Sequence, residues 1–169
     1  NLGNPTAMFY LGVMYKNGEG VEQSYEEAFD WYMKAAELGN ADAMNDLGYL
    51  YSLGYGVEED ASKAFDWYSK AAELGNSVAI GNLGIMYEYG NGVKQSYDKA
   101  IEQYTKASDL GDTDAMCYLG NLYCSASGSK QSYETALNWY EKAAELENTT
   151  AMLYLSYMYE YGNGVEQSY

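Results

Sequence analysis

The sequence predicts an all-α fold, a solenoid of 36-residue helix–turn–helix repeats, and three observations predict it. Marker residues recur every 36 positions without insertion or deletion, as expected of stacked repeats. Apolar residues follow a helical period within each half of a unit. Proline occurs once, at position 5, whereas alanine, leucine and tyrosine abound. The recurring residues include Ala7, Ala43, Ala79, Ala115 and Ala151; Leu11, Leu47, Leu83, Leu119 and Leu155; Tyr15, Tyr51, Tyr87, Tyr123 and Tyr159; and Tyr32, Tyr68, Tyr104 and Tyr140.

The period divides the chain into one array of four complete units and one partial unit. The units are expected at about 5–40, 41–76, 77–112, 113–148 and 149–169. The end of the sequence repeats residues 18–25 and stops where a second helix would start. We therefore expect a fragment of a longer array, whose uncapped ends let copies self-associate.

Each unit is predicted to hold two helices. The first spans about 5–17 and ends at Asn17-Gly18, where a glycine-rich turn follows. The second begins at Ser24, which with Glu27 forms a predicted capping box, and it ends at Leu38-Gly39. The same N-cap position holds Asp60, Ser96 and Ser132 in the later units.

The fourth unit departs from this pattern at two places. Glu147 replaces the glycine that ends the other second helices, which should cost about 1 kcal/mol if the backbone is unchanged. In the loop at 125–130, Ala126 and Ser129 stand where the other units have glycine and valine, so we expect this loop to be the least typical part of the array.

Each helix has a packing face and an outer face at 100° per residue. In the first helix of the first unit, positions 7, 8, 11, 12, 14 and 15 form the apolar packing arc. Positions 6, 9, 10, 13, 16 and 17 lie opposite, and there the copies differ. The second helix turns a charged arc to solvent. Its predicted (i, i+4) ion pairs are Asp30–Lys34, Asp66–Lys70 and Glu102–Lys106.

The repeated motif resembles the Sel-1-like repeat family, a relative of the tetratricopeptide repeats. The second unit carries its pattern almost completely, at Ala43, Leu47, Gly48, Tyr51, Gly54, Gly56, Val57, Asp60, Lys63, Ala64, Trp67, Tyr68, Lys70, Ala71, Ala72 and Gly75. The resemblance implies a right-handed superhelix whose concave face is lined by the first helices. It also implies a role as a protein-binding scaffold or adaptor.

Two departures from the family pattern limit the comparison. A cysteine-rich branch links neighbouring helices by disulfides, but no cysteine occupies the corresponding positions here. Gln103 replaces the usual tryptophan of the third unit, which lowers its buried aromatic area.

Composition excludes several functions. The net charge is −16 and all nine basic residues are lysines, which disfavours nucleic acid and anionic membranes as partners. Histidine, the usual general base and commonest metal ligand, is absent. Cys117 and Cys124 are seven residues apart, too far to form a disulfide along one helix and too few for a zinc site. We expect no enzyme activity, no cofactor, no metal and no membrane insertion.

The variable face of the first helices is the candidate binding site, for a protein or peptide segment with basic flanks. A face that is merely exposed to solvent should be polar, so the large apolar residues on this face favour a binding role. Two asparagines would fix the partner's backbone. The predicted contact residues are Phe9, Val13, Asn45, Tyr49, Ser52, Ile85, Glu88, Cys117, Asn121, Leu153 and Tyr157.

Alternatives to binding remain. The array could be a structural spacer that holds flanking domains, with no ligand in the groove. The S-x-x-K tetrapeptides at Ser96 and Ser127 lack the partner motifs of a serine enzyme. Asp109, Asp112 and Asp114 do not fit a calcium loop, and the glycosylation sequon at Asn148 has meaning only in a secreted protein.

Overall fold

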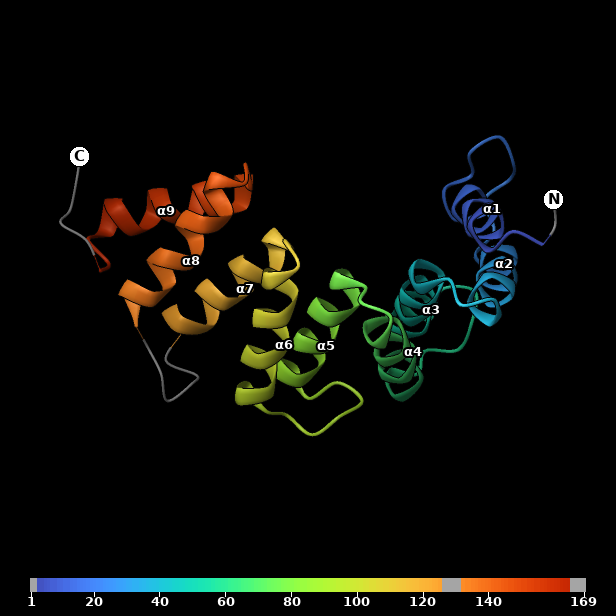
Figure 1. Cartoon of the computed structure of the whole chain (residues 1–169), viewed down its shortest axis with the longest axis horizontal. Helices are drawn as coiled ribbons and strands as arrows, with labels where there is room; N and C mark the ends of the chain where they lie inside the picture. Colours follow the sequence, from blue (N-terminus) through green and yellow to red (C-terminus); the bar gives the residue numbers. More distant parts are fainter. Residues whose placement is uncertain (1–2, 126–131, 165–169) are drawn as a thin grey trace. The chain divides into compact units, whose positions relative to one another are not determined.

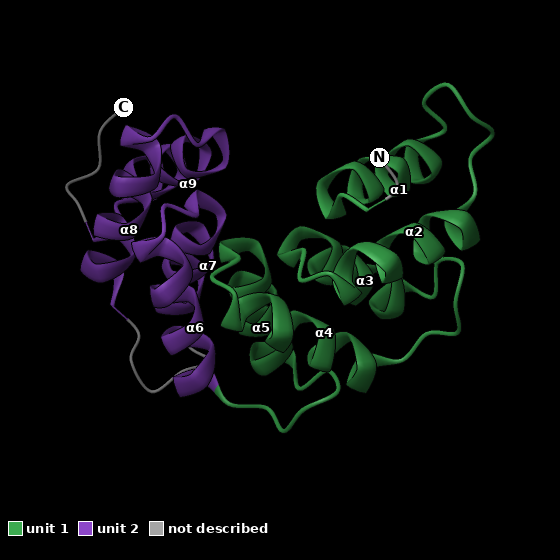
Figure 2. Cartoon of the chain, turned by 45° about the vertical axis from the view of Figure 1, so that its right-hand side comes forward, with its two compact units in different colours: residues 1–96 green, residues 97–169 purple. Residues whose placement is uncertain are grey.

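The computed structural model describes residues 3–125 and 132–164, which form nine α-helices and no strand (Figure 1). The chain divides into two compact units, residues 1–96 and 97–169 (Figure 2). Unit 1 contains α1 (Pro5–Asn17), α2 (Tyr25–Glu37), α3 (Ala41–Leu53), α4 (Ala61–Glu73) and α5 (Ser77–Tyr89). Unit 2 contains α6 (Tyr97–Asp109), α7 (Thr113–Cys124), α8 (Tyr133–Glu145) and α9 (Thr149–Tyr161). The predicted all-α repeat of helix pairs is confirmed.

The first helix of each repeat begins at a carboxamide or carboxylate cap. The side-chain oxygens of Asn40 and Asn76, for example, accept the backbone N–H of Ala43 and Ala79 at 2.8 Å. The caps also join neighbouring repeats, because Asn76 Nδ2 donates to Asp42 Oδ1 at 2.8 Å. The first helices α1, α3, α5 and α9 end at a glycine in the left-handed conformation, as the sequence predicts.

The second helices begin at the predicted caps, but the capping box is only half formed. Ser24 Oγ accepts the backbone N–H of Glu27 at 3.1 Å. The backbone N–H of Ser24 donates to the carbonyl of Tyr15 at 3.0 Å, so it does not need the Glu27 side chain. The backbone N–H groups of the other capping residues donate in the same way to backbone carbonyls, in the pairs Asp60–Tyr51, Ser96–Tyr87 and Ser132–Tyr123. This repeated backbone bond fixes the turn within each helix pair.

The second helices end in one backbone geometry, even where glycine is missing. Gly39 has φ 84°, and Glu147 takes the same left-handed conformation with φ 63°. The backbone N–H of Asn148 still donates to the carbonyl of Ala143 at 3.0 Å, as Asn40 does to Ala35 at 3.1 Å. The fourth unit therefore keeps the backbone of the other units at this helix end. The atypical loop at 125–130 lies outside the described residues, apart from Ser125.

The two helices of a pair pack closely because a buried tyrosine of the second helix contacts a glycine of the first. The rings of Tyr32, Tyr68 and Tyr140 lie directly on the first helix of their own repeat, over Gly12, Gly48 and Gly120. A Cβ atom on Gly48 would stand 2.7 Å from a ring carbon of Tyr68, closer than real contacts allow. The glycine in the packing arc is thus required by the close approach of this ring.

The charged outer arc differs from its prediction in two of three repeats. Only Lys106 forms its (i, i+4) ion pair, with Glu102 at 2.7 Å. Lys34 and Lys70 lie instead over the indole rings of Trp31 and Trp67, 4.3 and 4.0 Å from the ring centroids. The physical reason is competition, since a tryptophan three residues earlier offers the ammonium a cation–π contact. Where Gln103 replaces that tryptophan, the lysine turns to the glutamate.

Candidate functional site

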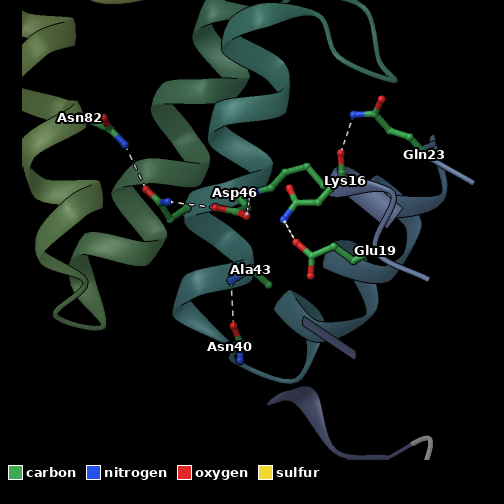
Figure 3. Close-up of polar contacts among 9 residues, drawn as sticks. Lys16, Glu19, Gln23, Asn40, Ala43, Asp46 and Asn82 are labelled. Atoms are coloured by element: carbon green, nitrogen blue, oxygen red, sulfur yellow. Dashed lines mark hydrogen bonds and ion pairs between the residues drawn. The ribbon is translucent and has the colours of Figure 1, made fainter. Parts of the chain in front are cut away.

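A chain of polar contacts crosses the first helices of unit 1 (Figure 3). Lys16 Nζ on α1 pairs with Asp46 Oδ2 on α3 at 2.8 Å, and both side chains are largely buried. Asn45 Nδ2 donates to Asp46 Oδ1 at 3.3 Å, and Asn82 Nδ2 on α5 donates to Asn45 Oδ1 at 3.1 Å. These contacts hold α1, α3 and α5 side by side on one face of the unit.

A hollow of about 590 Å³ lies on this polar chain. Its floor includes the Lys16–Asp46 pair and the carboxamides of Asn45 and Asn82. The rest of its lining is formed by Asn17, Gln23, Tyr25, Tyr49 and Val78. The side chain of Gln23 is fixed there, because its Nε2 donates to the carbonyl of Lys16 at 2.8 Å.

A second hollow of about 370 Å³ adjoins the first. Tyr49 and Asn82 line both hollows, so the two are neighbours, and we call them together the unit 1 groove. The second hollow is more apolar, and its lining is completed by Ser52, Leu53, Glu59, Ala61, Tyr68, Ile85, Met86 and Asn91. The groove thus offers a polar and an apolar compartment with a tyrosine between them.

Three tyrosines, which we call the tyrosine cluster, border the groove. The rings of Tyr25 and Tyr55 stack at 4.7 Å, and Tyr49 meets Tyr55 edge-on at 6.2 Å. Tyr49 is 41 % exposed and Tyr55 is 39 % exposed. Both rings therefore keep much of their surface available to a ligand.

A buried hydroxyl lies near the floor of the groove. Tyr32 is fully buried, and its Oη lies near the Asp46 carboxylate without forming a hydrogen bond of good geometry among the described residues. Burial raises the pKa of Tyr32, and the nearby Asp46 carboxylate raises it further. Burial also raises the pKa of Tyr68 to about 12, with the Ser52 hydroxyl opposing the shift. Both phenols are neutral at physiological pH and cannot act as bases there.

In unit 2 the corresponding positions are filled by aromatic rings. Tyr118 and Tyr154 occupy the repeat position of Asp46 and Asn82, and they lie on Tyr104 and Tyr140 at 5.2 and 5.0 Å. The hydroxyl of Tyr140 donates to Asn121 Oδ1 at 2.7 Å. Asn121, which was predicted to fix a partner's backbone, therefore already accepts a hydrogen bond from within the fold.

The two cysteines, one buried and one partly buried, lie in surroundings that disfavour the thiolate. Cys117 is buried, which corrects its expected place among the contact residues, and its Sγ lies 3.5 Å from Asn148 Oδ1. Burial, with Asp114 and Asp112 nearby, raises the pKa of Cys117 to about 11. Burial likewise raises the pKa of Cys124. Both thiols are protonated at neutral pH, so this environment does not favour thiolate chemistry.

The remaining predicted contact residues are scattered. Asn45, Tyr49, Ser52 and Ile85 line the unit 1 groove. Phe9 and Val13 are partly buried and pack on the core around Tyr32, so they support the groove rather than line it. Glu88 is partly buried and lines neither hollow. In unit 2, Leu153 and Tyr157 are about half exposed on α9.

Several groove residues were missed from the sequence. Lys16, Asp46 and Asn82 carry the polar chain, while Gln23 and Tyr25 come from the turn and the start of α2. Asp46 and Asn82 share one repeat position on the variable face. It is polar only in the second and third repeats and tyrosine in the others, which is a readable signal.

Other candidate motifs have structural roles. Asp112 caps α7 by accepting the backbone N–H groups of Asp114 and Ala115 at 3.0 Å. The sequon residue Asn148 donates to Thr113 Oγ1 and Asp114 Oδ1 and accepts from the N–H of Ala151. Its carboxamide is therefore occupied in the folded chain. Ser127 lies outside the described residues.

Within residues 3–125 and 132–164, no three or more cysteine, aspartate or glutamate side chains are grouped to hold a metal ion. None of the helices there is both long and apolar enough to cross a membrane.

Helix pairs that recur every 36 residues, with a ligand-sized groove on their first helices, define an α/α tandem-repeat protein. The Sel1 repeat model matches residues 5–40, 41–76, 77–112, 113–148 and 149–169. The chain belongs to the Sel1 repeat family. Proteins of this family generally serve as non-catalytic scaffolds for protein interaction.

Solved structures agree with this assignment. A protective antigen of uropathogenic Escherichia coli, c5321, is 36% identical over 98% of this chain and 35% of its own, with a TM-score of 0.86. A Sel1 repeat protein from Oxalobacter formigenes is 34% identical over 98% of this chain and 68% of its own, with a TM-score of 0.92. Helicobacter pylori cysteine rich protein B is 28% identical over 65% of this chain and 90% of its own, with a TM-score of 0.55. This chain thus spans about a third of the E. coli antigen. No curated protein matches it significantly.

Proposed function

We propose that this chain is a protein-interaction module that holds a peptide or protein segment in the unit 1 groove. The observation that carries the proposal is the pair of adjoining hollows, about 590 and 370 Å³, on the first helices of one compact unit. Their combined lining joins large apolar side chains to a few placed polar groups, as binding sites usually do.

Preorganisation supports the same proposal. Asp46 is held by both Lys16 and Asn45, and Asn45 by Asn82, before any ligand arrives. A partner that meets fixed side chains loses less conformational entropy on the receptor side of the complex. The groove therefore suits recognition of a flexible segment, which itself becomes ordered on binding.

Site-directed photo-crosslinking in a lysate of the source organism tests the proposal. A photoreactive amino acid replaces Tyr49 in the groove, and a second bait carries it in place of Asp66 on the exposed outer arc of α4. We expect a protein to be captured from position 49 and not from position 66. Circular dichroism of both baits verifies equal helicity.

Other crosslinking results would support a different binding surface or a different role. Capture from position 66 alone would move the binding surface to the outer arc. Absence of any capture at either position, in a lysate that contains the native partners, would favour the alternative role as a structural spacer. A third bait, labelled in place of Tyr157 on α9, tests whether the surface of unit 2 takes part.

A further inference from the structure

We propose that the occupant of the unit 1 groove is a proline-rich segment in the polyproline II conformation, with an arginine or lysine beside it. This inference rests on the proposed function and adds the chemistry of the partner. Three features support it. They are the tyrosine cluster, the side-chain N–H groups of Asn45 and Asn82 that remain available in the groove, and the acidic residues Glu58 and Glu59 at its edge.

The groove disfavours the other common modes of peptide recognition. Residues 3–125 and 132–164 contain no β-strand, so they offer no sheet edge to which a peptide could add a strand. An amphipathic helix needs a continuous apolar groove, whereas the first hollow has the Lys16–Asp46 ion pair on its floor. Burying that pair under an apolar helix face would remove it from water without compensation. An extended segment with free backbone carbonyls avoids both difficulties.

The tyrosine cluster offers the surface that proline rings use. Polyproline II segments dock on grooves lined by aromatic rings, and their fixed conformation reduces the entropy lost on binding. Tyr49 separates the two hollows, and Tyr55 stacks on Tyr25 at the border of the first. The partly exposed rings of Tyr49 and Tyr55, which meet edge-on at 6.2 Å, thus offer two neighbouring sites for proline.

The turn between α3 and α4 fixes this cluster. Gly56 has φ 69°, and a Cβ atom there would stand 2.5 Å from the backbone carbonyl carbon of Tyr25. The turn therefore packs directly on the start of α2, which brings Tyr55 onto Tyr25. Among the corresponding turn positions of the five repeats, Glu19, Tyr55, Asn91, Ser127 and Asn163, only the second is aromatic.

The floor supplies donors for the partner's carbonyl groups. Asn45 and Asn82 each spend one side-chain N–H within the polar chain, which leaves the second N–H of each without a partner. A polyproline II segment has no internal hydrogen bonds, so its carbonyl oxygens are free to accept these donors. Proline also brings no backbone N–H that would need an acceptor in the groove.

The negative charge at the edge of the groove favours a basic residue next to the prolines of the segment. Glu59 lines the second hollow, and Glu58 precedes it on the same exposed turn after Tyr55. The single lysine of the floor is already neutralised by Asp46. The rim is therefore negative, as is the whole chain with its net charge of −16. A basic residue next to the prolines would meet these glutamates and the face of a tyrosine.

The test uses a fluorescent peptide with PxxP spacing and an arginine flank, and a counterpart in which alanine replaces every proline. Anisotropy titration of the whole chain should give about tenfold weaker binding for the alanine peptide. Tyr49→Ala and Tyr55→Ala should each weaken the proline peptide about tenfold. Tyr161→Ala, which removes a 67 % exposed tyrosine of unit 2, should leave binding unchanged. Circular dichroism verifies that the variants remain folded.

Each contrary outcome is informative. Equal binding of both peptides, weakened by Tyr49→Ala, would overturn the need for proline while the groove remains a peptide site. Binding that neither tyrosine variant changes would overturn the assignment of the site. Absence of binding by either peptide would overturn the proline inference alone, because crosslinking from position 49 tests the proposed function independently.

Discussion

At the scale of single residues, equivalent tyrosine hydroxyls are held differently in different repeats. Tyr140 donates to Asn121 Oδ1 at 2.7 Å, whereas the buried Tyr32 hydroxyl forms no hydrogen bond of good geometry among the described residues. A buried unpaired hydroxyl costs free energy, while a paired one contributes about 1 kcal/mol. We predict that Tyr140→Phe lowers the free energy of unfolding by about 1 kcal/mol, whereas Tyr32→Phe leaves it unchanged or raises it.

Urea denaturation followed by tryptophan fluorescence measures both changes. Each variant removes one oxygen from a buried ring, so each serves as the matched control of the other. Equal destabilisation by the two substitutions would contradict the prediction, since it would mean that the Tyr32 hydroxyl also has a partner.

Glu147 is a second residue whose cost can be measured. It holds the left-handed conformation, with φ 63°, that glycine holds at positions 39, 75 and 111. We predict that Glu147→Gly raises the free energy of unfolding by about 0.5–1 kcal/mol, because relief of backbone strain exceeds the greater entropy of the unfolded chain. Glu145→Gly, at the end of α8, should lower it by a similar amount. A stability loss in both variants would show that Glu147 is not strained.

At the scale of helices, the contact between a glycine and a tyrosine sets the distance within the pairs α1–α2, α3–α4 and α7–α8. Gly48→Ala would place a methyl group 2.7 Å from the ring of Tyr68, which is fully packed and cannot move away. We predict a loss of about 1–3 kcal/mol in the free energy of unfolding, despite the better helix propensity of alanine.

Ser156→Ala provides the control for this change at the level of the helix. Ser156 occupies the same repeat position on α9 but is exposed, so alanine there should be neutral or slightly stabilising. Thermal denaturation of the two variants compares them directly. If Gly48→Ala proved as stable as Ser156→Ala, the ring would not be what requires the glycine.

At the scale of the whole molecule, charge is the dominant property. Twenty-five acidic residues face nine lysines, which gives a net charge of −16 at pH 7. Repulsion among these charges destabilises the folded state, and salt screens it. We predict that sodium chloride raises the melting temperature by about 2–4 °C between low and physiological ionic strength. A sucrose solution of equal osmolality is the control, and a melting temperature that falls with salt would contradict the prediction.

Self-association also belongs to this scale and stays a prediction. Ala7 is exposed on α1, although its counterparts Ala43, Ala79, Ala115 and Ala151 are buried. On α9, Met152, Leu153 and Tyr157 are about half exposed. We expect the mass measured by light scattering to rise at millimolar concentration, and Leu153→Glu to reduce that rise. A strict monomer over this range would contradict it.

Much of the fold could be predicted because its signals are local and repeated. Helix ends, caps and packing faces follow from the identity of a few residues, and a 36-residue period displays each signal several times. Even the left-handed backbone of Glu147 could be inferred from the glycines at the same position. The predictions that failed concerned groups for which two partners compete. Lys34 and Lys70 can contact a carboxylate or an indole, and in the structure they contact the indole. The backbone N–H of Ser24 can donate to a side chain or to a backbone carbonyl, and it donates to the carbonyl.

The candidate site was predicted only in outline for the same reason. Asn45, Tyr49, Ser52 and Ile85 were found because helical periodicity puts them on one face. Asp46 and Asn82 belong to that face too, but their importance depends on a hydrogen-bonded chain that spans three helices. Asn121 and Cys117 looked equally available from periodicity, yet neighbouring helices occupy one and bury the other.

The amino-acid sequence by itself determined the helix pairs, their period, the family and the charge of this protein. These follow from local propensity and composition, which act over a few residues and are repeated along the chain. Only the tertiary structure decided where the groove lies, because hollows form where side chains from different helices leave space. In unit 1 the groove lies beside the polar residues Asp46 and Asn82, whereas at the same repeat position of unit 2 Tyr118 and Tyr154 pack on Tyr104 and Tyr140.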